Sequence, residues 1–258
     1  VKNIGKLPVL ILDGEEVKGA KQNRVLNSTI MVAPGVTTTI PVSCVERGRW
    51  SRKSRTFTDS DQVMTSSSRR SKMSRVTESL MRHRGYDANQ NIVWADVDEV
   101  SESIGIKSKT SAMSDAYKEK RSSLNEYKES FPIVTNQCGM IAVIDGKVIG
   151  IDMVSRHNPF IDMHSKLINS YAMDAYRSQK QDINVAEASE FLDRLIRSIE
   201  SVHASAGMGN DHRLSGKHIV GSALVVDDTA VHLTAFHKPE SKKEKEKPED
   251  FGPIIYRD

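Results

Sequence analysis

The sequence predicts an α+β fold, with antiparallel β-hairpins at the N-terminus, central helices and a second antiparallel sheet covered by two long helices. Runs rich in β-branched residues end at turn pairs such as Asp13-Gly14, Pro34-Gly35 and Asp145-Gly146, which is typical of hairpins. Between these runs, apolar residues recur with the spacing of amphipathic helices. We expect one α+β domain over residues 1–236 and a charged tail over residues 237–258.

The first 50 residues contain the predicted N-terminal hairpins. Residues 7–12 are an apolar run that ends at Asp13-Gly14, a pair suited to a tight turn. Residues 24–32 and 36–45 are predicted to be the two arms of a hairpin that turns at Pro34-Gly35. The polar residues before the first arm and after the second arm should therefore lie at the same open end.

Polar side chains gather at this open end and form the main candidate ligand site. They are Gln22, Asn23, Arg24, Glu46, Arg47, Arg49 and Trp50. Arg47 and Arg49 flank Gly48, so in an extended segment both guanidinium groups point to one side, which suits an anion. Trp50 offers a plane on which a base can stack, and Glu46 can orient an arginine. The alternative is structural, with an internal pair of Glu46 and Arg47 and with Trp50 in the core.

The basic character of the chain is regional. The net charge is +3 over 258 residues, but residues 47–84 contain eleven Lys or Arg against three Asp or Glu. Residues 51–75, which are rich in Ser and Arg, are predicted to be a flexible basic loop. Such a loop either follows the phosphates of an RNA or is a solvated connector, and both interpretations stay open.

Five helices are predicted after this loop. Two lie on either side of Gly85, and their apolar stripes are Met73, Val76 and Leu80, then Val93, Val97, Val100 and Ile104. A third covers about residues 111–127, and Phe131-Pro132 follows it. The two long helices that cover the second sheet run from Asn158-Pro159 to about residue 175 and over residues 185–202.

The second sheet is predicted from two hairpins, residues 138–154 around Asp145-Gly146 and residues 217–236 around Asp227-Asp228. Asp152 lies inside an apolar arm, so its carboxylate must be paired or hydrogen-bonded. Gln137 precedes the same hairpin. We predict that Gln137 and Asp152 meet the Glu46 cluster in one electropositive cleft of roughly a few hundred Å³.

Several motifs argue against specific classes of protein. Cys44 and Arg49 are one residue too close for the C-x5-R loop of cysteine phosphatases, and Cys44 is expected to be buried. No histidine or cysteine spacing predicts a metal, and the acidic turn at Asp13, Glu15 and Glu16 is more typical of solvent exposure. No motif identifies a cofactor. Two cysteines, and neither a signal peptide nor a membrane span, predict a cytoplasmic protein without a membrane partner.

Three segments carry a family resemblance: residues 12–15 (LDGE), 19–27 (GAKQNRVLN) and 41–50 (PVSCVERGRW). They resemble the ADP-ribosylglycohydrolase and rhodanese-phosphatase associated protein domain family, an uncharacterised bacterial and archaeal group. A weaker likeness extends through Gln137 and Asp152 to residues 231–236. Members carry more strands before the first segment, so the resemblance implies an N-terminally truncated chain. It also implies a role near NAD, ADP-ribose or RNA-repair chemistry.

Together, the polar cluster and the resemblance predict a ligand-binding domain for a nucleotide-type ligand, such as ADP-ribose, NAD or an RNA end. One alternative is a carboxylate-dependent hydrolase, in which Glu46 or Asp152 is a general base with a raised pKa beside the arginines. The other is an assembly module, in which the polar face is a contact within a homo-oligomer.

Overall fold

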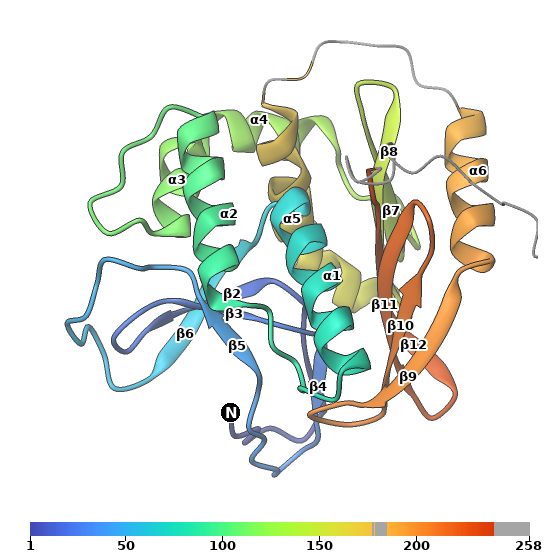
Figure 1. Cartoon of the computed structure of the whole chain (residues 1–258), viewed down its shortest axis with the longest axis horizontal. Helices are drawn as coiled ribbons and strands as arrows, with labels where there is room; N and C mark the ends of the chain where they lie inside the picture. Colours follow the sequence, from blue (N-terminus) through green and yellow to red (C-terminus); the bar gives the residue numbers. More distant parts are fainter. Residues whose placement is uncertain (177, 179–184, 240–258) are drawn as a thin grey trace, which may run out of the picture.

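The computed structural model describes residues 1–176, 178 and 185–239 and confirms the predicted α+β class. Within these residues the strands form three antiparallel sheets, and the helices pack between and outside them (Figure 1). Strand β12 (Thr229–His237) extends one residue beyond the predicted domain end. Most of the predicted charged tail, residues 240–258, lies outside the described residues.

The N-terminal part contains a two-stranded and a four-stranded sheet. In the small sheet, β1 (Val9–Ile11) pairs with β4 (Ile30–Val32). The larger sheet has the order β5-β3-β2-β6. Its strands are β2 (Glu15–Gly19), β3 (Arg24–Leu26), β5 (Val42–Cys44) and β6 (Phe57–Val63). Because β3 and β5 are antiparallel partners, residues 22–24 and 46–50 do lie at the same end of the sheet.

The predicted first arm at residues 24–32 is wrong as one strand, because it divides between two sheets. Its first part, β3, pairs with β5 as expected, but its second part, β4, pairs with β1. The break coincides with three buried polar residues. Asn27 donates a side-chain hydrogen bond to the Tyr86 carbonyl, and the Thr29 hydroxyl bonds the ring of His232. These side-chain bonds replace the strand pairing at the break.

The second sheet has six strands in the order β7-β8-β12-β11-β10-β9. Its strands are β7 (Gly139–Ile144), β8 (Lys147–Val154), β9 (Ile199–Ala204), β10 (Asn210–Ser215) and β11 (Ile219–Val226), together with β12. Both predicted hairpins are present. Asp145-Gly146 and Asp227-Asp228 all have positive φ, between 47° and 70°, which is the conformation of tight hairpin turns.

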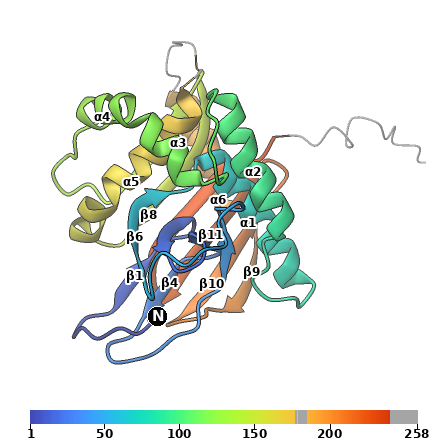
Figure 2. The same cartoon turned by 90° about the vertical axis from the view of Figure 1, so that its left-hand side faces the viewer.

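The described helices are α1 (Ser66–Met81), α2 (Gln90–Ser103), α3 (Met113–Glu119), α4 (Arg121–Ser130), α5 (His157–Ala175) and α6 (Val185–Ile196). The stripes predicted for the first two helices are confirmed, because Met73, Val76, Val93 and Val97 are all buried. The predicted third helix divides at Lys120 into α3 and α4. Figure 2 shows α3 and α4 far from the N-terminus.

Two sequence predictions about these elements are wrong. The expected flexible loop at residues 51–75 contains β6 and most of α1, because the Thr65 side chain caps α1 and buried carboxylates neutralise its Arg69 and Lys72. The expected helix at residues 185–202 ends at Ile196. Ile199 and Val202 are instead in β9, where pairing with β10 overrides their helical spacing.

Both faces of the six-stranded sheet are covered, as Figure 1 shows. On one face, Phe191 and Leu195 of α6 pack against Ile151 and its neighbours. On the other face, Met73 of α1 and Tyr171 of α5 pack against Phe236. Asp152 follows Ile151 in β8 and points to the α1 and α5 layer, because side chains alternate along a strand. Its carboxylate is therefore enclosed.

Candidate functional site

Three residues of the predicted ligand cluster form one buried network. The Arg49 guanidinium binds both carboxylate oxygens of Glu46, at 2.8 Å and 2.6 Å, and the side-chain oxygen of Asn23 at 3.2 Å. It also donates to the carbonyls of Ala20 and Ser51. Glu46 in turn accepts from the Asn23 backbone N–H. The side chains of Glu46 and Arg49 are 5% and 6% exposed, so each saturates the other inside the protein.

The other members of this cluster lie around the network. Gln22 is buried, Arg24 is half-buried in β3, and Trp50 is 68% exposed. Arg47 is half exposed and makes a surface ion pair with Asp98 at 2.9 Å. The structural alternative is therefore wrong in its details, since Glu46 pairs with Arg49 instead of Arg47 and Trp50 is outside the core. Ligand contacts of Arg47 and Trp50 stay a prediction.

Asp152 is the centre of a second buried network. Its two oxygens accept hydrogen bonds from Arg69, at 2.9 Å and 2.6 Å, and the Tyr171 hydroxyl donates a third at 2.8 Å. Arg69 also reaches the Thr234 hydroxyl and lies over the Phe236 ring. Both side chains of the ion pair are fully buried. A bidentate pair of this kind satisfies a carboxylate that the sheet and the helices exclude from water.

The two networks do not join as the sequence predicts. Gln137 bonds the Val134 N–H and the Gly139 carbonyl near the surface, and its own carbonyl binds His157. Within the described residues, no hydrogen bond or ion pair connects Gln137 or Asp152 with Glu46 or Arg49. The nine predicted residues thus separate into a network at the end of the four-stranded sheet, a network under α1, and a surface turn. Their role in binding a ligand stays a prediction.

The general bases suggested by the hydrolase alternative have the wrong pKa shifts. Burial alone would raise the pKa of Glu46, but hydrogen bonds from Arg49 and from the Asn23 N–H outweigh burial and lower it. Burial would likewise raise the pKa of Asp152, but the charge of Arg69 holds it well below its usual range. The predicted raised pKa is wrong for both residues, and both carboxylates already have strong donors.

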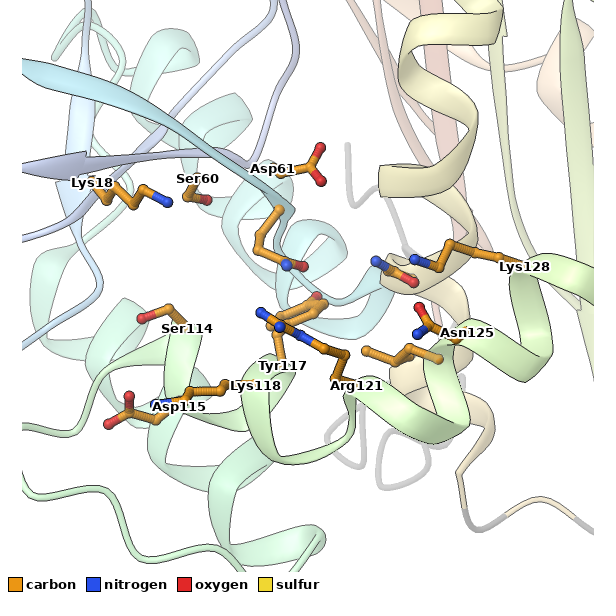
Figure 3. A pocket seen from close by; sticks show the side chains of 13 residues that line it. Lys18, Ser60, Asp61, Ser114, Asp115, Tyr117, Lys118, Arg121, Asn125 and Lys128 are labelled. Atoms are coloured by element: carbon orange, nitrogen blue, oxygen red, sulfur yellow. The ribbon is translucent and has the colours of Figure 1, made fainter.

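A second feature is a cleft beside strands β2 and β6 that extends to α3, α4 and α5 (Figure 3). Its volume is about 390 Å³. The lining residues are Lys18, Ser60, Asp61, Gln62, Ser114, Asp115, Tyr117, Lys118, Arg121, Leu124, Asn125, Lys128 and Asn169. Figure 3 shows Lys18 and Ser60 on the strand side and Ser114 to Arg121 on the helix side. The cleft is within the usual size range of ligand sites, about 300–1,000 Å³.

The cleft is electropositive. Lys18, Lys118, Arg121 and Lys128 line it, against the carboxylates of Asp61 and Asp115. Among the described residues, none of these four cations has an ion-pair partner within 4.0 Å. One of the two acids, Asp115, accepts a hydrogen bond from Ser108. The arrangement therefore offers unpaired positive charge to an anion.

Glu16 connects the Glu46 network to the floor of this cleft. One of its oxygens accepts a hydrogen bond from the Asn23 side chain at 3.1 Å, and it lies beside Ser60 and Lys18, which line the cleft. Glu16 is fully buried, and its second oxygen has no hydrogen-bond partner among the described residues. Glu16 thus joins the Asn23, Glu46 and Arg49 network to residues that line the cleft.

Burial raises the pKa of Glu16, so its carboxyl should make stability depend on pH. Because the folded state holds this proton more tightly than the unfolded state, stability should fall as pH rises from the ordinary value of 4.5 through the raised value. We expect Glu16→Gln to remove this decline in stability and to be more stable than wild type at pH values above the raised pKa of Glu16. Urea denaturation between pH 4 and 8 measures this, with the exposed Glu78→Gln as control. Parallel curves for wild type and Glu16→Gln would contradict it.

The residues of this cleft are not predicted from the sequence, although one signal is present. Arg121, Asn125 and Lys128 recur with i, i+4 and i+7 spacing, so they lie on one polar face of α4. Lys18 and Gln62 give no such signal, because only the pairing of β2 with β6 brings these two residues to the same cleft. The acidic turn also differs from the expected solvent exposure. Asp13 pairs with Lys72, and Glu15 pairs with Lys166.

The fold and the site define the class of this protein as an α+β domain with buried ion pairs and an electropositive surface cleft. The family model of the ARG and Rhodanese-Phosphatase-superfamily-associated Protein domain matches residues 1–236, and the chain belongs to this family. No curated protein and no solved structure matches it. None of the described helices combines the length and apolar composition needed to cross a membrane.

Proposed function

We propose that this protein binds a nucleotide-type ligand, such as ADP-ribose, NAD or the terminal nucleotide of an RNA, in the cleft between β6 and helices α3 to α5. The main support for this proposal is the set of four cationic side chains that line a cleft of about 390 Å³ and have no ion-pair partners among the described residues. A phosphate group satisfies such cations through charge-assisted hydrogen bonds, and Arg121 can make two of them at once. The volume suits a mononucleotide or one half of a dinucleotide.

This proposal keeps the nucleotide-type ligand that the sequence predicts. Its contacts are now assigned to the cleft between β6 and helices α3 to α5 instead of the Glu46 cluster. Asn23, Glu46 and Arg49 hold the end of β2, the strand that carries Lys18, and they contact Glu16 next to the cleft. Hydrogen-bonded polar groups next to a site keep its side chains in place. We therefore assign these three residues a positioning role.

Removing two cations tests the proposal. We expect Arg121→Gln with Lys128→Gln to weaken binding of ADP-ribose or AMP at least about 100-fold, since each charge-assisted contact contributes about 1.5–3 kcal/mol. Isothermal titration calorimetry measures the change. The matched control is Lys107→Gln with Lys109→Gln, which removes the same charge from exposed positions outside the cleft. Equal affinities of the two double variants, or no binding by the wild-type protein, would count against the proposal.

Location and self-association also stay proposals. Cys44 is buried and Cys138 half-buried, and both are free thiols, which supports a reducing, cytoplasmic location. The edge strand β9 exposes Ile199 and Val202, 77% and 55%, close to the exposed Ile196 at the end of α6. An apolar edge of this kind is the surface that a homo-oligomer would use.

A further inference from the structure

The floor of the cleft differs chemically from its rim. Asn169 of α5 lines the cleft and is only 6% exposed, yet its side-chain oxygen has no hydrogen-bond partner among the described residues. The Gln62 side-chain oxygen lines the same floor and also lacks a partner there, whereas the Ser60 hydroxyl lies beside the Glu16 carboxylate. Buried polar atoms are nearly always hydrogen-bonded, because an unsatisfied one is costly. The two amide oxygens in one cleft therefore point to a ligand.

A local irregularity of β6 brings these groups to the floor. The pairing of β2 with β6 shifts register between Glu15 and Val17, opposite the Asp61 region. Asp61 has φ of 62°, and its N–H donates to the Asp59 carboxylate at 2.9 Å. As a result three consecutive residues of β6, from Ser60 to Gln62, line the cleft, where a regular strand would turn every second side chain away. Bulges often redirect side chains in this way at sites.

Positively charged side chains lie at the rim of the cleft, whereas the amide oxygens lie on its floor. Lys18, Lys118 and Arg121 are exposed, so they lie at the rim, whereas Asn169 is buried. Amide oxygens accept hydrogen bonds, so the oxygens of Asn169 and Gln62 require a ligand with O–H or N–H donors. The rim requires an anion. A simple inorganic anion would satisfy the rim only and would leave the floor unpaired.

We infer that the cleft selects a phosphate ester whose other end carries hydroxyl or amine donors, with the phosphate at the rim and the donors on Asn169 and Gln62. A phosphorylated ribose, alone or within a nucleotide, has both ends. This inference rests on the proposed function and deepens it. Asn169 and Gln62 are then specificity-determining residues, while Lys118, Arg121 and Lys128 supply affinity for the phosphate.

Two probes with the same phosphate charge test the inference on the full chain. Ribose 5-phosphate carries hydroxyl donors, and methyl phosphate carries none. By isothermal titration calorimetry, we expect wild type to bind ribose 5-phosphate at least about tenfold more tightly, because its hydroxyl groups can donate to both amide oxygens. Asn169→Leu should remove most of this preference and leave the affinity for methyl phosphate unchanged. Gln62→Leu, at a half-buried position, is the second variant if Asn169→Leu does not fold.

The outcomes separate the inference from the proposed function. If wild type binds both probes equally, or if the preference persists in the Asn169 or Gln62 variant that folds, the inference is overturned and anion binding stands. If neither probe binds, and ADP-ribose and AMP do not bind either, the proposed function fails and the inference fails with it. Arg121→Gln with Lys128→Gln should weaken both probes to the same extent, because it removes only the phosphate contacts.

Discussion

Replacing Arg69 by methionine is expected to destabilise the protein by about 3–5 kcal/mol, because it leaves the Asp152 carboxylate buried without its counter-charge. This is a large part of the roughly 5–15 kcal/mol that holds a typical domain folded. The midpoint of urea denaturation measures the loss. The control is Arg47→Met, which breaks an ion pair whose side chains are 50% and 32% exposed. Exposed pairs contribute about 0–1 kcal/mol, so the control midpoint should move little.

Neutralising the partner should recover part of this loss. In Arg69→Met with Asp152→Asn, no uncompensated charge remains, and the asparagine oxygen can still accept the hydrogen bond of Tyr171. We therefore expect the double variant to be more stable than Arg69→Met alone. A double variant that is no more stable than the single one would show that packing of the guanidinium, including its contact with Phe236, matters more than charge.

The pH dependence gives a second test of the same ion pair. In the wild type, Arg69 lowers the pKa of Asp152, so the stability from this group is present above the ordinary aspartate pKa and is lost as pH falls through the lowered value. Without Arg69, burial still raises the pKa of the carboxyl, and only His232 and the Tyr171 hydroxyl remain to oppose it. Arg69→Met should therefore lose less stability relative to wild type at about pH 4 than at pH 7.

The elements that the sequence predicts correctly are those with strong local signals. Asp145-Gly146 and Asp227-Asp228 adopt positive φ in tight turns, and both hairpins form. The stripe from Val93 to Val97 is buried on α2 as its spacing predicts. The prediction that residues 22–24 and 46–50 share an end of a sheet is also confirmed, because it depends only on the pairing of β3 with β5. Local turn chemistry and periodicity are sufficient for these features.

The features that the sequence does not predict depend on contacts between distant residues. Residues 66–75 are too basic and polar to predict a buried helix, but Asp13, in the turn after β1, and Asp152, in β8, neutralise Lys72 and Arg69. Asp152 is predicted as a site residue because a lone acid in a strand needs a partner, and the sequence does not show that Arg69 of α1 is that partner. The cleft residues come from two strands and three helices, so no single segment indicates them.

Replacing Arg49 by methionine is expected to lower stability by about 2–4 kcal/mol and to loosen the turn between β2 and β3. Arg49 donates to the carbonyls of Gly19 and Ala20, which have φ of 135° and 43°, and it neutralises the buried Glu46. Arg49→Lys should recover only part of the loss. A lysine keeps the charge, but its single ammonium cannot span acceptors that the planar guanidinium reaches together. Urea denaturation of both variants measures these losses.

The same variants decide between a structural and a ligand-binding role for Arg49. The matched control is Arg24→Met, which removes an arginine of the same predicted cluster from a half-buried position, and its free energy of unfolding should change by less than about 1 kcal/mol. If Arg49 supports the fold, Arg49→Lys lowers the denaturation midpoint, and its affinity for ADP-ribose changes little under conditions where it is folded. An unchanged midpoint together with lost binding would instead assign Arg49 to the ligand, as its position beside Arg47 and Trp50 in the sequence predicts.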